Sequence, residues 1–327
     1  MNLTVACGDY DRVRPLKDET VRVDGARLNI LSLTPEEIFF RALGHAEFDV
    51  CELSLSSTLM LLSRDACPYT PLPIFPSRSF RHSCIYVRHG AGIEKPEDLR
   101  GRRVAIPEYQ VTAAMVARGI LADEYGVQPS DVEWVQAGLF EPGREEKVTF
   151  TSPAGVTLRR VTDRNCTDLF ESAEVDALIA PRAPAGFDPA GNGLIRRLFP
   201  DPVVVEEAYY RKTGIFPIMH WLVIRNDLLE RHPWLPASLV KAFTRAKDMA
   251  LAELADVTAL NVALPFLPSH VSAAHRLFGP DFWPYGLEAN RKTLEAQVRW
   301  SWEQGLSARQ IDVDTLFPPQ TLASFKV

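Results

Sequence analysis

A group of positively charged side chains stands inside an apolar segment of the sequence. Residues 75–87 read Phe-Pro-Ser-Arg-Ser-Phe-Arg-His-Ser-Cys-Ile-Tyr-Val, so Arg78, Arg81 and His82 fall within a predicted buried strand. A buried cation needs an anionic partner. The arginines either pair with carboxylates of the protein itself, or lie in solvent as most arginines do, or bind an anionic ligand.

A second segment of the same kind favours the ligand. Residues 214–224 carry His220 within an apolar, β-branched run that also predicts a strand. We expect both segments to cross between two lobes and to line a cleft for a small anion.

Carboxylates and hydroxyls follow two of the predicted strands. A strand over residues 3–7 leads into a loop with Asp9 and Asp11, and a strand over 48–53 leads into a serine-rich turn that begins a helix. Open α/β sheets bind ligands at the carboxyl ends of their strands. The start of the helix exposes backbone N–H groups that suit a carboxylate, although ordinary capping explains the serines equally well.

Strands and helices alternate along the rest of the chain. Thr34 is predicted to cap one helix, Gly126 to end a helix that starts at Thr112, and residues 21–33 to form a hairpin-like edge around Asp24. We expect further strands at 103–106, 132–135, 175–180 and 218–224, and helices at 235–254 and 287–304. We expect residues 257–284 to be irregular with short helical turns.

Size and charge narrow the class of protein. The 327 residues are 46% hydrophobic and 24% charged, which is typical of a globular protein long enough for two lobes. The net charge of −6 and the lack of a basic stripe argue against nucleic-acid binding. A small anion would therefore need a local positive site within a negative protein.

Five scattered cysteines without CxxC spacing indicate thiols kept reduced inside a cell. The first seven residues have neither the basic nor the apolar region of an export signal, and no run of about 18 apolar residues predicts a membrane span. We expect a cytoplasmic protein.

The common catalytic motifs are absent. The sequence has no GxGxxG after a strand, no GxxxxGK[ST], no HExxH and no GxSxG. Its seven histidines have no local metal-ligand spacing, although ligands of a divalent metal could still converge in space. Catalysis by side chains alone, without a cofactor or metal, is the simpler expectation.

Two segments point to a fold family. Residues 93–105, with the sequence Ile-Glu-Lys-Pro-Glu-Asp-Leu-Arg-Gly-Arg-Arg-Val-Ala, and residues 175–179 resemble the segments by which type 2 periplasmic-binding-protein folds enter and recross their second lobe. The resemblance implies a two-lobed α/β fold in which each lobe is a mixed sheet flanked by helices, with a cleft between them. We expect lobe 1 to comprise 1–88 and 218–327, and lobe 2 to comprise 89–217.

More specific blocks resemble one enzyme family built on that fold, the 4,5-dihydroxyphthalate decarboxylases. The likeness runs from the first strand to about Phe243. It is carried by residues 8–15, 52–56, 75–83, 107–113, 181–184 and 206–220. The resemblance implies a cytoplasmic carboxy-lyase of aromatic catabolism (phthalate degradation) that converts 4,5-dihydroxyphthalate to protocatechuate and carbon dioxide.

That reaction implies a cationic clamp and two proton transfers. Each ring hydroxyl is para to one carboxylate, so removing a phenolic proton enriches the ring carbon that must be protonated before carbon dioxide leaves. Arg78, Arg81 and Arg182 are candidates for the clamp, because a guanidinium binds a carboxylate bidentately. His82 and His220 are candidates for proton transfer, with a buried structural role as the alternative for each.

Other candidates come from the same blocks. Glu108 and Asp9 are candidate acids or bases, and Asp11 and Glu52 are candidate substrate ligands, or else they neutralise the arginines. Hydrogen bonds to substrate oxygens are expected from Ser54, Ser56, Tyr109, Gln110 and Thr112. An apolar wall against the departing carboxylate is expected from Phe80, Phe216, Ile218 and Trp221.

Two other functions stay open at this point. One is a solute-binding receptor for an aromatic carboxylate, and the other is a quinone-biosynthesis lyase on the same fold. Under the leading reading the partner is a small aromatic dicarboxylate, with no nucleic acid or membrane, and the chain forms a homo-oligomer.

Overall fold

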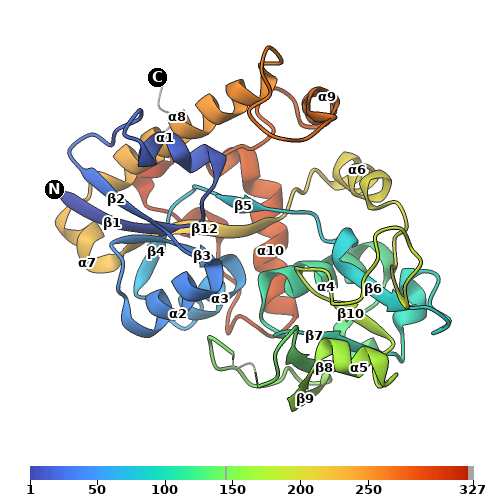
Figure 1. Ribbon diagram of the computed structural model, residues 1–327. Coiled ribbons are helices and arrows are strands. Elements are labelled where there is room, and N and C mark those ends of the chain that lie inside the picture. The colour runs from blue at the N-terminus through green and yellow to red at the C-terminus, as the bar shows by residue number, and fades with distance from the viewer. Residues whose placement is uncertain (144–145, 323–327) are drawn as a thin grey trace.

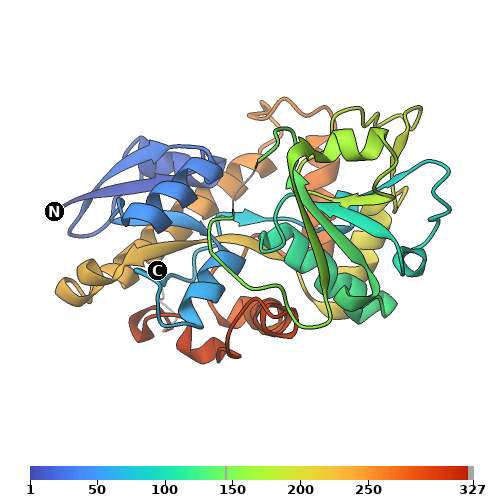
Figure 2. The same ribbon diagram turned by 90° about the horizontal axis from the view of Figure 1, so that it is seen from below.

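The structure is a computed structural model that describes residues 1–143 and 146–322. Two mixed β-sheets lie side by side, each with helices packed on it (Figure 1). The view turned by 90° shows the same division, with the green and cyan sheet beside the blue and orange one (Figure 2). The α/β, two-sheet prediction is confirmed.

The first sheet has the strand order β2-β1-β3-β12-β4, and β5 also pairs with β12. Its strands are β1 (Asn2–Cys7), β2 (Arg27–Ser32), β3 (Val50–Ser54), β4 (Tyr69–Pro71), β5 (Ser77–Arg78) and β12 (Ile218–Arg225). β1 is parallel to β2 and β3, whereas β12 is antiparallel to β3, β4 and β5. A strand from late in the sequence therefore occupies an interior position of this sheet.

The second sheet has the order β11-β6-β10-β7-β8-β9. Its strands are β6 (Ile85–Arg88), β7 (Arg103–Ile106), β8 (Glu133–Gly138), β9 (Thr157–Asn165), β10 (Ala177–Ile179) and β11 (Ile195–Arg197). The chain passes between the sheets at residues 79–84 and again at 198–217. β6 pairs in the second sheet, although the expected boundary at residue 88 groups it with the first lobe.

Alternation along the strands divides the core of the first sheet into two layers. Leu3 and Val5 of β1 pack with Phe243 of the long helix α8 on one face. Ala6 and Leu53 pack with the helices α2 and α3 on the other face. The helices are α1 (Arg14–Lys17), α2 (Pro35–His45), α3 (Leu55–Leu62), α4 (Thr112–Tyr125), α5 (Cys166–Glu171), α6 (Pro202–Thr213), α7 (Asn226–Arg231), α8 (Leu235–Ala255), α9 (Leu267–Phe278) and α10 (Arg291–Glu303).

Several local predictions are confirmed. The Thr34 side chain accepts a hydrogen bond from the Glu37 N–H at the start of α2, and the Ser54 side chain accepts one from Ser57 at the start of α3. Gly126 ends α4 in the left-handed conformation, at φ 64°. The Thr34 and Ser54 side chains each accept a hydrogen bond from an N–H group that the first turn of a helix leaves unpaired.

Two local predictions are wrong. Residues 21–33 do not form a hairpin, because β2 pairs with β1 in parallel and only an isolated bridge joins Val23 to Ala26. The segment 257–284 is not irregular throughout, because α9 occupies twelve of its residues. Pro268 stands in the first turn of α9, where a proline costs no helical hydrogen bond.

No helix in the described residues is long and apolar enough to cross a membrane.

Candidate functional site

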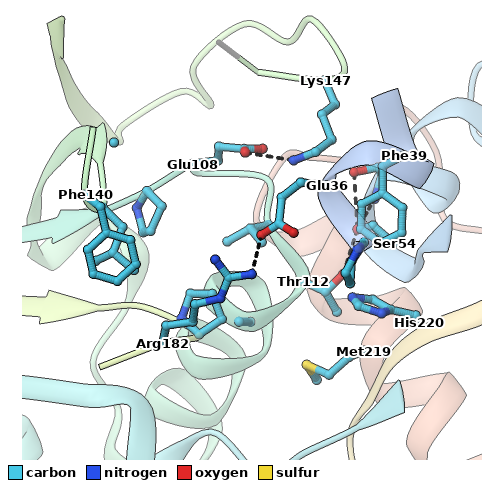
Figure 3. A pocket seen from close by; sticks show the side chains of 18 of the residues that line it. Glu36, Phe39, Ser54, Glu108, Thr112, Phe140, Lys147, Arg182, Met219 and His220 are labelled. Atoms are coloured by element: carbon cyan, nitrogen blue, oxygen red, sulfur yellow. Dashed lines mark hydrogen bonds and ion pairs between the residues drawn. The ribbon is translucent and has the colours of Figure 1, made fainter. Parts of the chain in front are cut away.

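A cavity of about 500 Å³ lies between residues of the two sheets (Figure 3). From the first sheet and its helices it takes the start of α2, the end of β3 and the start of β12. From the second it takes the turn between β7 and α4, the loop after β8 and the residues after β10. Six of the predicted site residues line it, namely Ser54, Arg81, Glu108, Thr112, Arg182 and His220.

Arg81 brings a positive charge to this cavity from the first crossing segment. Its Nε lies 3.0 Å from the thioether sulfur of Met219, which also lines the cavity. No carboxylate of the described residues lies within ion-pair distance of its guanidinium, and burial lowers the pKa of Arg81, an effect that Cys84 and Glu206 partly oppose. A guanidinium in these surroundings is stabilised by any anion that enters the cavity.

His220 is held from behind by Glu52. The imidazole Nδ1 lies 2.5 Å from Oε1 of Glu52, which is fully buried, and the ring of Phe39 meets the imidazole edge to face at 5.0 Å. The Glu52 carboxylate also accepts hydrogen bonds from the Tyr10 hydroxyl at 2.7 Å and from the Gly8 N–H at 2.9 Å.

Burial alone would raise the pKa of Glu52, but the bonds from His220, Gly8 and Tyr10 outweigh it and hold the pKa below its usual value. Glu52 is therefore a carboxylate anion behind the cavity wall. Since Glu52 occupies Nδ1, Nε2 is the ring nitrogen of His220 that a ligand in the cavity can reach.

A hydrogen bond joins the two sides of the cavity at its floor. The hydroxyls of Ser54, at the end of β3, and Thr112, at the start of α4, lie 2.9 Å apart. The Thr112 hydroxyl also accepts from the backbone N–H of Ser56 at 3.1 Å. Ser54 and Thr112 thus hold two helix starts together where they face the cavity.

Glu108 forms an ion pair on the opposite wall. Its Oε1 lies 2.8 Å from Nζ of Lys147, and the Glu108 side chain is 2% exposed (Figure 3). Glu146 lies behind this pair; burial, aided by the Glu108 charge, raises its pKa to about 7. The Glu108 carboxylate and the Lys147 ammonium belong to the lining of this wall, whereas Glu146 does not.

A third charged pair lies at the solvent side of the cavity. Arg182, which follows β10, donates to Glu36 of α2 at 2.9 Å, and their side chains are 59% and 41% exposed. Phe39 and Phe140 are apolar side chains of the lining (Figure 3). The cavity lining therefore combines charged pairs with apolar side chains, and in Figure 3 the Glu36–Arg182 pair lies between Phe140 and Phe39.

The structure does not bring Arg78 to this cavity. Its guanidinium donates to the carbonyl oxygens of Pro284 and Phe216 and to Asn290 Oδ1, and it lies over the Phe216 ring at 4.8 Å. β5 and the turn after it point Arg78 and Arg81 to different sides of the chain. Arg78 joins the second crossing segment to the residues before α10.

His82 also lies away from the cavity. It is 1% exposed, and its ring packs against Phe199 at 5.3 Å and Tyr209 at 5.1 Å. Neither ring nitrogen has a hydrogen-bond partner in the described part of the chain, and burial lowers its pKa to about 4. The imidazole is therefore neutral near pH 7.

Six further candidates do not line the cavity. Asp9 and Asp11 pair with Lys17 and Arg12 near the surface. Tyr109 stacks under Arg118 at 3.8 Å, and Gln110 donates to the carbonyl oxygen of Val148. Ser56 is buried behind the floor, and Phe216 stacks on Phe80.

Comparison with known proteins identifies the family. The chain is 44% identical over its full length, and over 99% of the relative, to a 4,5-dihydroxyphthalate decarboxylase of Comamonas testosteroni. It is 42% identical over 212 residues, which are 64% of this chain and 82% of the relative, to an enzyme of the same name from Pseudomonas putida. This chain belongs to the 4,5-dihydroxyphthalate decarboxylase family.

Solved structures show the fold of this family member. It aligns over 98% of both chains with the periplasmic aliphatic sulphonate binding protein SsuA of Escherichia coli, at 14% identity and a TM-score of 0.53. A Candida albicans protein described as having the generic periplasmic binding protein fold aligns with a TM-score of 0.51 at 10% identity, over all of this chain and 99% of its own. Residues 79–152 match the NMT1/THI5-like family model. The periplasmic-binding-protein fold is confirmed.

Sequence reasoning missed several groups that this decarboxylase-family chain places in the cavity. Lys147, Glu36 and Phe140 lie in a loop or the first turn of a helix, where charged and single apolar residues are common without any function. A signal existed only for Met219, which is next to His220 in the predicted crossing strand. Within the described residues, no group of three His, Cys, Asp or Glu side chains is placed to hold a metal ion.

Proposed function

We propose that this protein removes one carboxylate from 4,5-dihydroxyphthalate, giving protocatechuate and carbon dioxide. The two homologous decarboxylases support the reaction. The observation that carries the proposal is the Arg81 guanidinium, which shares the cavity with His220 and has no carboxylate partner among the described residues. A dianionic aromatic acid supplies the missing charge and fits between the apolar walls.

The two ends of the cavity orient this substrate. Arg81 contacts Met219, the neighbour of His220, so the cationic clamp and the imidazole belong to one end. Glu108 and Lys147 form the opposite wall. We infer that the two carboxylates face Arg81 and His220, and that the two hydroxyls face Glu108 and Lys147.

Two proton transfers follow from this orientation. The Glu108 carboxylate takes a phenolic proton, and the Lys147 ammonium stabilises the phenolate. The electron density moves to the ring carbon para to that oxygen, and His220 delivers a proton from Nε2 to this carbon. The carbon–carbon bond to the carboxylate then breaks, its electron pair restores the aromatic ring as a phenolate, and carbon dioxide leaves. The phenolate oxygen takes its proton back from Glu108, and solvent supplies a new proton to His220. The net reaction consumes one proton.

Four further statements belong to this proposal. We infer that no cofactor is needed, because His220 and Glu108 can supply both proton transfers. We infer a cytoplasmic location, which the five unpaired cysteines support. We infer a homo-oligomer, supported by apolar side chains exposed between α8 and α9, including Val257 and Phe266. We infer lobes that meet at the two crossing segments.

The test is product formation by the purified protein. Incubation with 4,5-dihydroxyphthalate should release equal amounts of protocatechuate and carbon dioxide, measured by chromatography and by trapped gas. Tight binding without product would instead favour a receptor, and turnover only of other aromatic acids in a substrate panel would favour a different lyase.

Arg81→Met tests the clamp. We expect kcat/KM to fall about 100-fold, because a charge-assisted contact of roughly 3 kcal/mol is lost. Arg211→Met is the matched control, since Arg211 is exposed on α6 and pairs with Glu207. Equal activity of the two folded variants would contradict the assignment of Arg81.

A further inference from the structure

The buried Glu52 carboxylate has three hydrogen-bond contacts, which come from the loop after β1 and from β12. Both of its oxygens are engaged, Oε1 by the Tyr10 hydroxyl and His220 Nδ1, and Oε2 by the Gly8 N–H. Its side chain is 0% exposed, so no ligand in the cavity can touch it. The prediction that Glu52 binds the substrate therefore does not match its place in the fold.

We propose that Glu52 is a positioning residue that holds the His220 imidazole with its proton on Nδ1 and with Nε2 toward the cavity. The inference rests on the proposed function, in which Nε2 exchanges a proton with the substrate. A carboxylate has no proton to donate, so a neutral imidazole that bonds to it must donate from a protonated ring nitrogen. The contact of Glu52 with Nδ1 therefore favours the His220 tautomer with its proton on Nδ1. The same charge stabilises the imidazolium before it gives up its proton.

The backbone geometry makes this contact rigid. Glu52 and His220 stand on the adjacent antiparallel strands β3 and β12, where Leu222 is paired with Glu52 and His220 with Ser54. The loop after β1 contributes Gly8 and Tyr10 from the other side. Three segments of the first sheet therefore hold one carboxylate, and among the described residues no hydrogen bond to it comes from the second sheet.

The other charged groups near His220 come from the cavity lining. The Arg81 guanidinium contacts the sulfur of Met219, the residue before His220. The Lys147 ammonium lies 6.0 Å from the ring of Phe39, which packs on the imidazole. The Glu36–Arg182 and Glu108–Lys147 pairs line the same cavity, and the Glu141 carboxylate lines it as well. Glu52 is the one carboxylate among the described residues recorded in direct contact with the imidazole.

Nitrogen NMR on the unmodified protein gives the first test. Labelled histidine spectra, with His220→Asn used to assign the signal, should show His220 protonated on Nδ1 and without a proton on Nε2 when the ring is neutral. The opposite tautomer would overturn the proposal, and this measurement needs neither substrate nor a Glu52 variant.

Glu52→Gln gives the second test. The amide keeps the shape but removes the charge, so the imidazolium form of His220 loses the partner that stabilises it. With 4,5-dihydroxyphthalate, kcat should fall about 10- to 100-fold while KM changes less than about threefold, and the high-pH limb of kcat should move to lower pH. An unchanged kcat and an unchanged high-pH limb would overturn the inference.

Asp176→Asn is the matched control. Asp176 is a buried carboxylate of the second sheet that accepts from the backbone and side chain of Arg103. Its loss should lower thermal stability without changing the His220 tautomer. If the wild type makes no protocatechuate but shows the Nδ1 tautomer, and Glu52→Gln weakens that preference, the positioning role stands and the proposed function fails.

Discussion

The buried imidazole of His82 contributes to the pH dependence of the chain's stability. Burial lowers the pKa of His82 from 6.5 to about 4, because its ring lies between two aromatic rings without a hydrogen bond in the described residues. Between these two pH values the unfolded chain binds a proton at this residue and the folded chain does not. The free energy of unfolding therefore decreases as the pH is lowered from 6.5 to 4, by at most roughly 1.4 kcal/mol per pH unit.

His82→Phe tests this account. A phenyl ring keeps the contacts with Phe199 and Tyr209 and removes two buried nitrogens that lack partners. We expect the free energy of unfolding at pH 7 to rise by about 1 kcal/mol, and its decrease between pH 6.5 and 4 to become smaller. Urea titrations at a series of pH values measure both. An identical pH dependence in the variant would mean that other groups cause it.

The sequence predicted the kinds of chemical group in the cavity better than it predicted which individual residues line the cavity. Arg78 and Arg81 are three positions apart and were equally good candidates, yet one donates to backbone carbonyls and the other faces the cavity. A short strand followed by a turn decides between them, and no feature of the local sequence fixes that turn. Lys147 could not be found, because its partner Glu108 is 39 positions away.

At the scale of elements, one glycine sets how closely two helices approach. Gly119 lies in α4, and a methyl group at this position would overlap the indole of Trp300 in α10. α10 contacts both α4 and α3, so it lies against helices of both sheets (Figure 1). The contact at Gly119 is therefore part of what holds the second sheet to the C-terminal helices.

Gly119→Ala has two opposite effects on stability, because it raises the helix propensity of α4 and overpacks its contact with Trp300. Alanine is favoured over glycine inside a helix by up to about 1 kcal/mol, whereas overpacking a core costs about 1–3 kcal/mol. We expect packing to dominate and the free energy of unfolding to fall by about 1–2 kcal/mol, measured by urea denaturation. Gly44→Ala in α2 is the control, because nothing lies within 4 Å of the added methyl group, and it should stabilise the protein. Stabilisation by both variants would show that Trp300 moves aside.

Helix ends were predictable because they depend on residues nearby in the sequence. Strand pairing was not predictable where the paired strand is distant in the sequence. Thr34, Ser54 and Gly126 mark helix ends through bonds within four residues, and all three were predicted. The pairing of β2 was not, because Asp24 and Gly25 are typical of a hairpin turn while the true neighbour, β1, lies across a helical segment. The strand with which β2 pairs is decided by the arrangement of the whole sheet.

At the scale of the whole molecule, the cavity exists because two sheets meet. The pair formed by Glu36 and Arg182 joins the α2 side to the segment after β10 at its solvent side, and Ser54 and Thr112 join the two sides at its floor. The fold family was recognisable from the sequence, but these contacts were not. Each one links positions far apart in the chain through a geometry that only the assembled fold provides.

A charge swap tests the pair at the solvent side. Glu36→Arg should place two cations together and favour separation of the two sides, raising KM for the aromatic dicarboxylate several-fold. The double variant Glu36→Arg with Arg182→Glu should recover part of this loss, although the exposure of both side chains limits the pair to about 1 kcal/mol. KM and the radius of gyration from small-angle scattering measure the effect. Additive effects in the double variant would contradict a direct pairing.

The place of β12 in the first sheet has a consequence for biosynthesis. The strands of the second sheet occupy one continuous stretch, residues 85–197, so the ribosome synthesises all of them before it makes β12. The first sheet begins earlier but stays divided between β3 and β4 until residues 218–225 arrive. During translation the inserted half of the molecule can therefore mature ahead of the half that contains the amino terminus. The His220 imidazole joins its carboxylate partner only in that last joining step.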